Sequence, residues 1–448
     1  MYDNNLAYVW DGESISEEFA TVTGLKQGCI LSALLFIIFL NDITDEVRGE
    51  ITVEGLTVPA LMYADDIVLF SETVDGMQLM INRLAIYCNR WNLEVNLQKS
   101  KMMIFRGGGG RYSRNEQWKY NGQTIDIVRE YKYLGVFVTS TLNMRQHLEG
   151  KLAEAKRAIS SLWERCFRNR YVEHSAKQKL FRSTALLYGT PVWGYSAFES
   201  VEKFLRYFVK RILCLPKTTP NYMVYLETGT PPLIMDTLAI HFNYIVKVFE
   251  MDGNRIPKKV LRAAIQGKGS MFEEWTNLAE TCGTTMNISS REQPSMLRRK
   301  FNEILEKFGS ILFERYASEA SSSLSRCYYN RLNYNLQQNS YLLNKNSLNK
   351  INIIFKARGE LLSLNFVPHR PDLPLLCSLC NLKAREDTFH FIAICPVLIE
   401  IRLRYFNKRN LEEGEMLSIL NGDQGWDGLY NYVITALRYR KAIIEEDF

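Results

Sequence analysis

The chain has 448 residues, a formal net charge of +6, 46% hydrophobic residues and 23% charged residues. These values are ordinary for a globular protein, so they exclude a disordered or fibrous chain, and the length suggests two or three domains. The charge is too mild to identify a partner by itself, so the basic residues must be judged by where they lie in the chain.

Nine cysteines are scattered along the chain, and we expect neither a secretory leader nor a membrane span. The first residues are polar, and the longest apolar run, residues 30–40, is too short to cross a bilayer. An odd number of cysteines without a leader indicates a reducing, intracellular environment. There, a close pair of cysteines more often binds a metal than forms a disulfide.

The first expected elements are strand and turn over residues 6–23, then a glycine loop that contains Gln27 and Gly28. Glycine lets the backbone approach a ligand closely, and a glutamine side chain can hydrogen-bond a base or a sugar. Such a loop is also a common entry to a helix. Residues 30–40 predict a buried apolar helix.

The chain is organised around a pair of adjacent carboxylates, Asp65 and Asp66, within an apolar stretch that runs from Ala60 to Phe70. The pattern predicts two short strands joined at a tight turn, with the acids at the tip and both flanks buried. Ionised carboxylates beside apolar sequence need a cation or hydrogen bonds, and Mg²⁺ takes carboxylates together with substrate phosphates. A solvated turn is the alternative, because aspartate is a common turn residue.

A helix and a lysine-bearing segment follow the acidic turn. Residues 77–91 have the apolar spacing of an amphipathic helix. Residues 93–105 predict a turn and then a strand, and they carry Lys99 and Lys101.

A second apolar hairpin is predicted after a flexible glycine run at residues 107–110. It spans residues 131–138 and contains Tyr133, Leu134 and Gly135.

Four motifs follow one another in this order: the glycine loop, the acid pair, the lysine-bearing segment and the second hairpin. Together they resemble the palm of a reverse transcriptase, most closely that of non-LTR (LINE-type) retrotransposons, over roughly the first third of the chain. The resemblance implies RNA-directed DNA synthesis by two-metal nucleotidyl transfer, with Asp65 binding Mg²⁺ (or Mn²⁺) and Asp66 beside it in support. It implies an RNA template, a DNA primer and deoxynucleoside triphosphates as partners, and a nuclear or cytoplasmic location. The other implied roles are nucleotide or template binding for Gln27, Gly28, Lys99 and Lys101, and a primer grip for Tyr133, Leu134 and Gly135.

The chain departs from the family pattern in two ways. Ser32-Ala33 stands where the family usually has Ser-Pro, which loosens the start of the helix. The family also carries a metal-binding aspartate on a strand before the glycine loop, preceded by a fingers region. Here only Asp3 and Asp11 are in reach, neither follows an apolar strand, and Asp42 comes after the loop. We therefore expect an N-terminally truncated polymerase that is weak or inactive by itself.

Two basic amphipathic helices are expected next, at residues 144–169 and 201–213. Apolar residues recur at helical spacing in both, while basic residues such as Lys151 and Lys210 lie largely off that stripe. After a palm, such helices would suit a thumb that grips nucleic-acid phosphates. A charged outer face is also normal for any surface helix.

The following segment predicts helices, notably at residues 297–317, and a polar stretch rich in tyrosine. These tyrosines would either stack on unpaired bases or pack between helices and loops, and packing is the favoured interpretation. They are Tyr328, Tyr329, Tyr334 and Tyr341.

Four possible metal ligands cluster near the C-terminus: Cys377, Cys380, His390 and Cys395. The spacing, Cys-x₂-Cys and then His-x₄-Cys, can enclose Zn²⁺ tetrahedrally, with the first pair on a tight knuckle and the second on a helix turn. Buried reduced cysteines without metal are the alternative. The segment resembles the zinc-knuckle-like tail of some non-LTR elements, which implies nucleic-acid binding.

The sequence thus predicts an α+β fold with a partial palm at 1–142, a helical thumb at 143–215, a helical connector at 216–370 and a zinc-knuckle-like module with a tail at 371–448. The expected function is that of an RNA-directed DNA polymerase of a non-LTR retrotransposon. One alternative is a non-catalytic nucleic-acid-binding protein derived from a retrotransposon. The other is a degenerate reading frame whose exposed sheet edge prevents stable folding.

Overall fold

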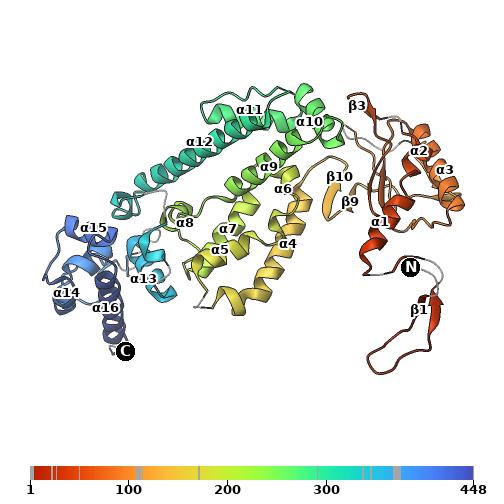
Figure 1. Ribbon diagram of the computed structural model, residues 1–448. Coiled ribbons are helices and arrows are strands. Elements are labelled where there is room, and N and C mark those ends of the chain that lie inside the picture. The colour runs from red at the N-terminus through yellow and green to blue at the C-terminus, as the bar shows by residue number, and fades with distance from the viewer. Residues whose placement is uncertain are drawn as a thin grey trace. The chain divides into compact units, whose positions relative to one another are not determined.

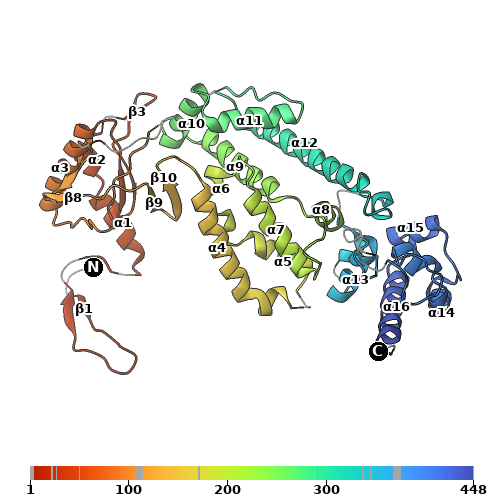
Figure 2. The same cartoon turned by 180° about the vertical axis from the view of Figure 1, so that it is seen from behind.

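The structure is a computed structural model, and it divides into two compact units (Figures 1 and 2). The first unit holds Met1–Tyr133 and Phe137–Asn143, and the second holds Leu134–Val136 and Met144–Phe448. The structure describes residues 5–21, 24–26, 28–49, 51–106, 113, 115–169, 172–289, 291–334, 338–343, 346–366 and 375–446. Asp3, Gln27 and the glycine run therefore lie outside the described residues. The predicted α+β class is confirmed.

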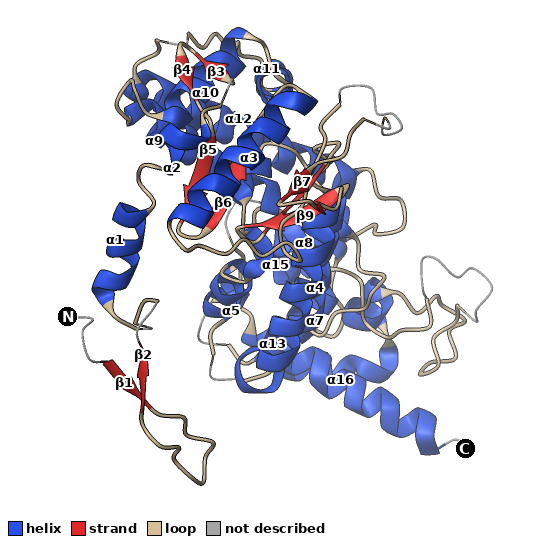
Figure 3. Cartoon of the chain, turned by 90° about the vertical axis from the view of Figure 1, so that its right-hand side faces the viewer, coloured by secondary structure: helices blue, strands red, loops and turns tan. Residues whose placement is uncertain are grey.

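The described part of the first unit combines short strands, paired two by two, with three helices (Figure 3). Its helices are α1 (Ile30–Phe39), α2 (Ile43–Val47) and α3 (Val74–Arg90). Its strand pairs are β1 (Asn5–Ala7) with β2 (Phe19–Thr21), β3 (Thr52–Val53) with β4 (Leu56–Thr57), β5 (Ala60–Tyr63) with β6 (Asp66–Leu69), and β7 (Lys119–Tyr120) with β8 (Gln123–Thr124). A fifth pair, β9 (Glu130–Tyr133) with β10 (Val136–Thr139), lies where the two units divide the chain.

Helix α3, which the sequence predicts, organises the first unit because it packs on two sides. Thr73 caps its start by accepting a hydrogen bond from the N–H of Gly76 at 3.0 Å. Met80 and Tyr87 pack with α2 and the β5–β6 hairpin in one small core. Ile81 packs in a second core with Tyr120 of β7 and with Trp118 and Ile125, which flank the β7–β8 pair. The two cores fix the acid-bearing hairpin against the helix.

Helix α1 forms where the apolar run predicts a helix, but its side chains are largely exposed. Ile30 and Ile38 are 93% and 62% exposed, while the one polar residue in between, Ser32, is buried. The prediction of a buried helix was wrong because composition favours the helix but does not specify what packs against it. A continuous apolar face of this kind marks a contact surface or an aggregation liability.

The predicted strand within residues 93–105 is also wrong. The segment forms turns, and only Met102 makes a β-bridge, parallel to Ile127. The N–H of Met102 donates to the carbonyl of Asp126 at 2.9 Å, and the N–H of Val128 donates back to Met102 at 2.8 Å. The segment pairs through a single residue, which is too little for a strand.

The second unit is helical. Its α-helices are α4 (Arg145–Leu162), α5 (His174–Arg182), α6 (Thr190–Trp193), α7 (Glu199–Ile212), α8 (Asn221–Thr228), α9 (Leu233–Glu250), α10 (Ile256–Gln266), α11 (Ser270–Thr281), α12 (Pro294–Ser321), α13 (Leu348–Arg358), α14 (Ile399–Phe406), α15 (Glu413–Asn421) and α16 (Asp427–Glu446). Short π- and 3₁₀-helical turns are η1 (Trp163–Phe167), η2 (Ala185–Leu187), η3 (Tyr329–Arg331), η4 (Ser340–Leu342), η5 (His390–Ile394) and η6 (Pro396–Leu398).

Two apolar cores hold the second unit together. The larger runs through helices from α4 to α16, and the smaller lies among α9, α10, α11 and α12. In the smaller core the rings of Phe242 and Phe301 stack with centroids 4.0 Å apart. Their helices, α9 and α12, run alongside each other in both views (Figures 1 and 2).

The tyrosine-rich stretch belongs to the larger core, as the packing interpretation predicts. Tyr329 and Tyr341 are fully buried, and Tyr328 and Tyr334 pack against the same core. The hydroxyl of Tyr341 donates to the buried carboxylate of Glu227.

A buried ion pair ties α8 to α13 beside these tyrosines. The guanidinium of Arg358 donates twice to the carboxylate of Glu227, at 2.9 and 3.1 Å, and both side chains are fully buried. A two-point contact of this kind compensates the burial of both charges.

The two predicted basic helices form as α4 and α7, but not all of their basic residues face solvent. Lys151 is only 6% exposed, and its Nζ donates to Glu154 at 2.9 Å. Lys210 turns its Nζ to the carbonyls of Lys217 and Thr219. The ammonium groups of these two lysines are therefore held by groups within the protein, because long basic side chains can also fold back over apolar surface.

Candidate functional site

The acid pair lies at the tip of a hairpin, as predicted. Strands β5 and β6 are antiparallel with Tyr63 opposite Asp66, so Ala64 and Asp65 form the turn. Ala64 has φ +54°, in the left-handed region that favours glycine. Both aspartates are exposed, so their carboxylates are open to a cation or a ligand.

The flanks of this hairpin are only partly buried, which corrects the prediction. Leu61 is 39% exposed, while Met62, Ile67 and Leu69 pack against the core that contains Met80. An isolated pair of strands has one face on the core and one in water, so alternate residues stay exposed.

Two tyrosines of strand β9 interact with the lysine-bearing turn and with the acid pair. The hydroxyl of Tyr131 donates to the carbonyl of Lys99 at 2.9 Å. Burial, together with the negative charge of Asp66, raises the pKa of Tyr133. Because alternate residues of a strand share a face, both tyrosines act on the same side of β9. The first unit thus brings together three of the predicted motifs.

The two candidate lysines differ in their partners. Lys101 donates from Nζ to a carboxylate oxygen of Asp126 at 2.6 Å. Lys99 is exposed, and in the described part of the chain it forms no ion pair. Its backbone N–H binds Asn96, which fixes the turn. Lys99 is therefore the lysine whose charge is available to an anionic ligand.

The glycine loop is described only in part, because Gln27 lies outside the described residues. Gly28 has φ +80°, so a residue with a Cβ would be strained there. Ser32 closes the start of α1 by donating from Oγ to the carbonyl of Lys26 at 2.8 Å. Ser32-Ala33 therefore starts the helix without the family's proline.

Asp11 and Asp42, the other described acids considered for the missing metal-binding aspartate, accept hydrogen bonds within the protein. The backbone N–H groups of Ser14 and Glu13 donate to Asp11 at 2.8 and 2.9 Å, and these bonds lower the pKa of Asp11. Asp42 accepts a 2.6 Å hydrogen bond from the hydroxyl of Tyr87.

The turn of the second hairpin is held within the second unit. The hydroxyl of Tyr188 donates to the carbonyl of Leu134 at 2.6 Å. The carbonyl of Tyr188 in turn accepts from Nε1 of Trp193 at 3.1 Å. Nζ of Lys151 lies 4.7 Å from the centre of the Tyr188 ring, in a cation–π contact. No sequence pattern indicated this pairing.

The Cys/His cluster is assembled as its spacing predicts. One ligand atom from each of Cys377, Cys380, His390 and Cys395 lies within 4.8 Å of the others, and all four residues are buried. Sγ of Cys380 is 3.4 Å from Nε2 of His390. Burial raises the pKa of the Cys377 thiol to about 12. Three thiols and an imidazole at these distances fit the donor set of a closed tetrahedral metal site.

A second layer of polar groups surrounds this cluster, and the sequence did not reveal it. Glu386 is fully buried and accepts two hydrogen bonds from Arg440 of α16, at 2.8 and 2.7 Å. Sγ of Cys377 lies 3.8 Å from the same carboxylate. The backbone N–H of His390 donates to Asp387 at 2.8 Å. Such outer contacts orient metal ligands. The only signal for them in the sequence is that two acids, Glu386 and Asp387, come shortly before His390.

Comparison with known proteins supports the resemblance to reverse transcriptases. Residues 2–138 match the family described as "Reverse transcriptase (RNA-dependent DNA polymerase)". The Pol polyprotein from the type-2 retrotransposable element R2DM of Drosophila melanogaster is 29% identical over 227 residues, 48% of this chain and 21% of that protein. The RNA-directed DNA polymerase from the mobile element jockey of Drosophila funebris is 25% identical over 210 residues, 45% of this chain and 22% of that protein. Residues 2–138 thus match reverse transcriptases, and the chain is similar to the polymerases of non-LTR retrotransposons.

The reverse transcriptase segment contains the acid pair, Lys99 and Tyr133, whereas the Cys/His cluster lies outside the matched residues. The probable RNA-directed DNA polymerase from transposon BS of Drosophila melanogaster is 26% identical over 183 residues, 39% of this chain and 20% of that protein. The aligned segments span about one fifth of each of these relatives. Among the described residues, no helix is both long enough and apolar enough to cross a membrane.

Proposed function

We propose that this chain acts in RNA-directed DNA synthesis, as part of the polymerase of a non-LTR retrotransposon. The observation that carries the proposal is the exposed pair Asp65 and Asp66 at the tip of the β5–β6 hairpin, inside the segment related to reverse transcriptases. The substrates would be an RNA template, a DNA primer and deoxynucleoside triphosphates. In this scheme residues 1–142 are a partial palm and residues 143–215 a thumb.

The donor set at the tip fits a hard divalent cation. Mg²⁺ prefers carboxylate oxygens and completes its shell with water and substrate phosphates, and both aspartates are open to solvent. We assign the metal contact to Asp65, with Asp66 beside it. When bound, Mg²⁺ or Mn²⁺ stabilises the attacking and leaving oxygens of phosphoryl transfer.

The remaining motif residues would position the substrates. Lys99, whose charge is not paired within the described chain, would contact the triphosphate, and Lys101 would need to leave Asp126 to do so. Gln27 and Gly28 would face the nucleotide and template. The primer end would rest on Tyr133 and the Leu134-Gly135 turn.

Activity of this chain alone is expected to be weak. Two carboxylates balance only half of the charge of two divalent ions, and Asp11 and Asp42 already accept hydrogen bonds elsewhere. Fewer bridging carboxylates hold the ions less firmly, which costs transition-state stabilisation.

Primer extension on an RNA template with Mg²⁺ or Mn²⁺ tests the proposal. The wild-type chain should extend the primer slowly, Asp65→Ala should lower extension by about 100-fold or more, and Asp45→Ala, an exposed acid on α2, should not. Extension that is unchanged in Asp65→Ala would contradict the assignment. A folded chain that binds template but extends nothing would leave a binding function instead.

The Cys/His cluster supports that second candidate, a metal-stabilised module for nucleic-acid binding. We propose Zn²⁺ as its metal, because three thiolates and one imidazole are soft, tetrahedral donors. Binding without catalysis would show a steep loss of affinity with salt, since basic residues release counterions from phosphates. The slope of log Kd against log salt, measured with and without extension activity, separates the two candidates.

A further inference from the structure

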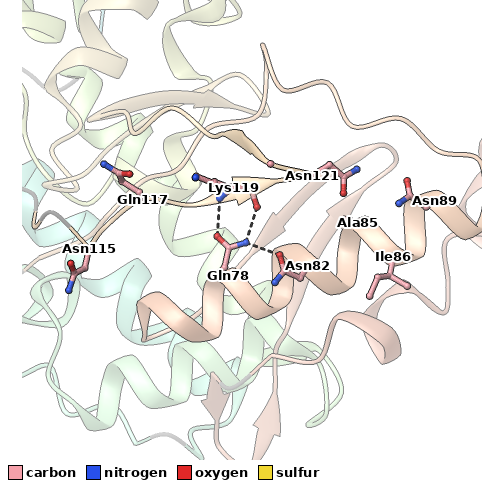
Figure 4. Close-up of a pocket in the computed structure, with 10 residues that line it drawn as sticks. Gln78, Asn82, Ala85, Ile86, Asn89, Asn115, Gln117, Lys119 and Asn121 are labelled. Atoms are coloured by element: carbon pink, nitrogen blue, oxygen red, sulfur yellow. Dashed lines mark hydrogen bonds between the residues drawn. The ribbon is translucent and has the colours of Figure 1, made fainter.

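A groove of about 660 Å³ lies in the first unit, and none of the residues assigned above lines it. It runs between α3 and the segment around β7 (Figure 4). What distinguishes it is a lining of amide side chains from both elements: Gln78, Asn82, Asn89, Asn115, Gln117 and Asn121.

The spacing on α3 places its contribution on one side of the helix. Gln78, Asn82, Ile86 and Asn89 follow each other at three- and four-residue intervals, so they share a face. From Gln78 to Asn89 that face is about 16 Å long. The amides are therefore spread along the length of the groove, and this arrangement suits an extended ligand.

The side-chain amide of Gln78 hydrogen-bonds to the backbone of β7 at the edge that borders the groove. The N–H of Lys119 in β7 donates to Oε1 of Gln78 at 2.9 Å, and Nε2 of Gln78 donates back to the Lys119 carbonyl at 2.8 Å (Figure 4). Gln78 thus occupies both groups by which an added peptide strand would pair at Lys119. This argues against a peptide ligand and leaves the amides beyond Gln78 to make the contacts.

The charge of the lining excludes simpler ligands. Of the described residues that line the groove, Lys119 is the one charged residue, and none is acidic. A metal ion would find no carboxylate, and a small anion would find a single cation. Amides offer donors and acceptors side by side, and Ile86, 60% exposed, offers an apolar surface.

We propose that this groove binds the unpaired bases of a nucleic-acid strand, with a preference for adenine. Asparagine and glutamine pair with adenine through two hydrogen bonds, and single strands present their base edges and faces to such surfaces. Asn89 and Gln117 would contact base edges, Ile86 a base face, and Lys119 a phosphate. The choice of nucleic acid among polar ligands rests on the proposed function, but the site is separate from the acid pair.

The test uses the full chain and fluorescein-labelled RNA octamers, rA₈ and rU₈, with binding followed by anisotropy. The variant is Asn89→Ala with Gln117→Ala, two exposed residues whose side chains form no hydrogen bond within the described chain. Its matched control is Asn41→Ala with Gln123→Ala, two exposed amides of the same unit that do not line the groove. The wild type should prefer rA₈, and the groove variant alone should weaken rA₈ binding about tenfold and lose the preference.

Two further readouts locate the effect. The salt slope of binding should stay constant in the amide variant, because amides release no counterions, and should fall by about 0.7 in Lys119→Gln. Ultraviolet crosslinks of rA₈ to the wild-type chain should map to peptides that contain Asn82–Asn89 or Asn115–Gly122.

The outcomes separate this inference from the proposed function, because primer extension is measured on the same variants. If rA₈ binding depends on the groove but no extension is seen, the groove is supported as a base-binding site and the proposed polymerase function is contradicted. Extension with equal octamer binding in the groove variant and control, or crosslinks only outside these peptides, would overturn the groove and leave the polymerase untouched. Displacement of rA₈ by an uncharged extended peptide would also overturn it, in favour of a peptide groove.

Discussion

Tyr188 reaches across 54 positions of the chain to hold the carbonyl of Leu134 with a 2.6 Å hydrogen bond. The same ring lies against Gly135, where an added Cβ would come within 3.0 Å of it. Gly135 also has φ +77°, so both space and backbone conformation require glycine there. The turn that we propose as a primer grip is therefore set by a residue outside the reverse transcriptase segment.

Replacing Tyr188 by phenylalanine should loosen this turn without emptying the space beside Gly135. The lost hydrogen bond should lower the free energy of unfolding by about 1 kcal/mol. If the turn holds the primer end, KM for the primer–template should rise several-fold while KM for the nucleotide stays unchanged. Denaturant unfolding and steady-state extension measure the two effects.

The control for this variant is Tyr207→Phe, which removes a hydroxyl from an exposed tyrosine of α7. It should change neither quantity. Equal primer KM values in Tyr188→Phe and the wild type, with the stability loss present, would reduce Tyr188 to a structural residue.

Lys99 and Lys101 should respond differently to neutralisation. Lys99→Gln should raise KM for the deoxynucleoside triphosphate about tenfold, because a charge-assisted contact to phosphate is worth roughly 1.5–3 kcal/mol. Lys101→Gln should have a small effect, because its charge is held by Asp126. Steady-state extension at varied nucleotide concentration compares them, and a larger effect for Lys101 would reverse our assignment.

Local patterns were sufficient for the elements that position the candidate site. The spacing of residues 77–91 predicted α3, and apolar runs on both sides of Asp65 predicted the hairpin. The ligand spacing from Cys377 to Cys395 predicted a cluster that the fold does assemble. Each of these depends on neighbours within a few residues or on one short loop.

Features that depend on distant partners could not be predicted. Lys151 is charged, yet it is buried because Tyr188 and Glu154 surround its ammonium group. Ile38 is apolar, yet it is exposed. The pairing of Glu386 with Arg440 joins residues 54 positions apart, and neither lies in a recognisable pattern. Whether a residue is buried depends on which distant residues pack against it, and the residue's own type does not specify this.

Metal loading of the Cys/His cluster should stabilise the chain and depend on its thiols. The wild type should bind one Zn²⁺, measured by elemental analysis, and Cys395→Ala should lose it. Free Zn²⁺ at about 1,000 times its Kd should raise the free energy of unfolding by about 4 kcal/mol in the wild type but not in Cys395→Ala. Cys327→Ala, an exposed cysteine elsewhere, is the control. Equal zinc content in all three proteins would contradict the assigned ligands.

Stability should fall in mild acid because of a buried histidine. His241 is fully buried in α9, its Nδ1 is 2.7 Å from the carbonyl of Pro191, and it accepts a hydrogen bond from Trp275 at 3.1 Å. Burial lowers the pKa of His241 to about 4. Below pH 6.5 the unfolded chain protonates this histidine while the folded chain does not, so protons favour unfolding.

The stability that neutral His241 contributes is therefore present above pH 6.5 and is lost as pH falls toward 4. The expected loss is about 1 kcal/mol at pH 5.5 and about 3 kcal/mol near pH 4. Urea unfolding at pH 7.5 and 5.5 should show a smaller difference in His241→Gln than in the wild type. Trp275→Phe should be less stable at both pH values but keep the wild-type difference, because its histidine still titrates. An identical difference in all three proteins would mean that the acid sensitivity arises elsewhere, with buried His174, whose pKa is also lowered to about 4, as the next group to replace.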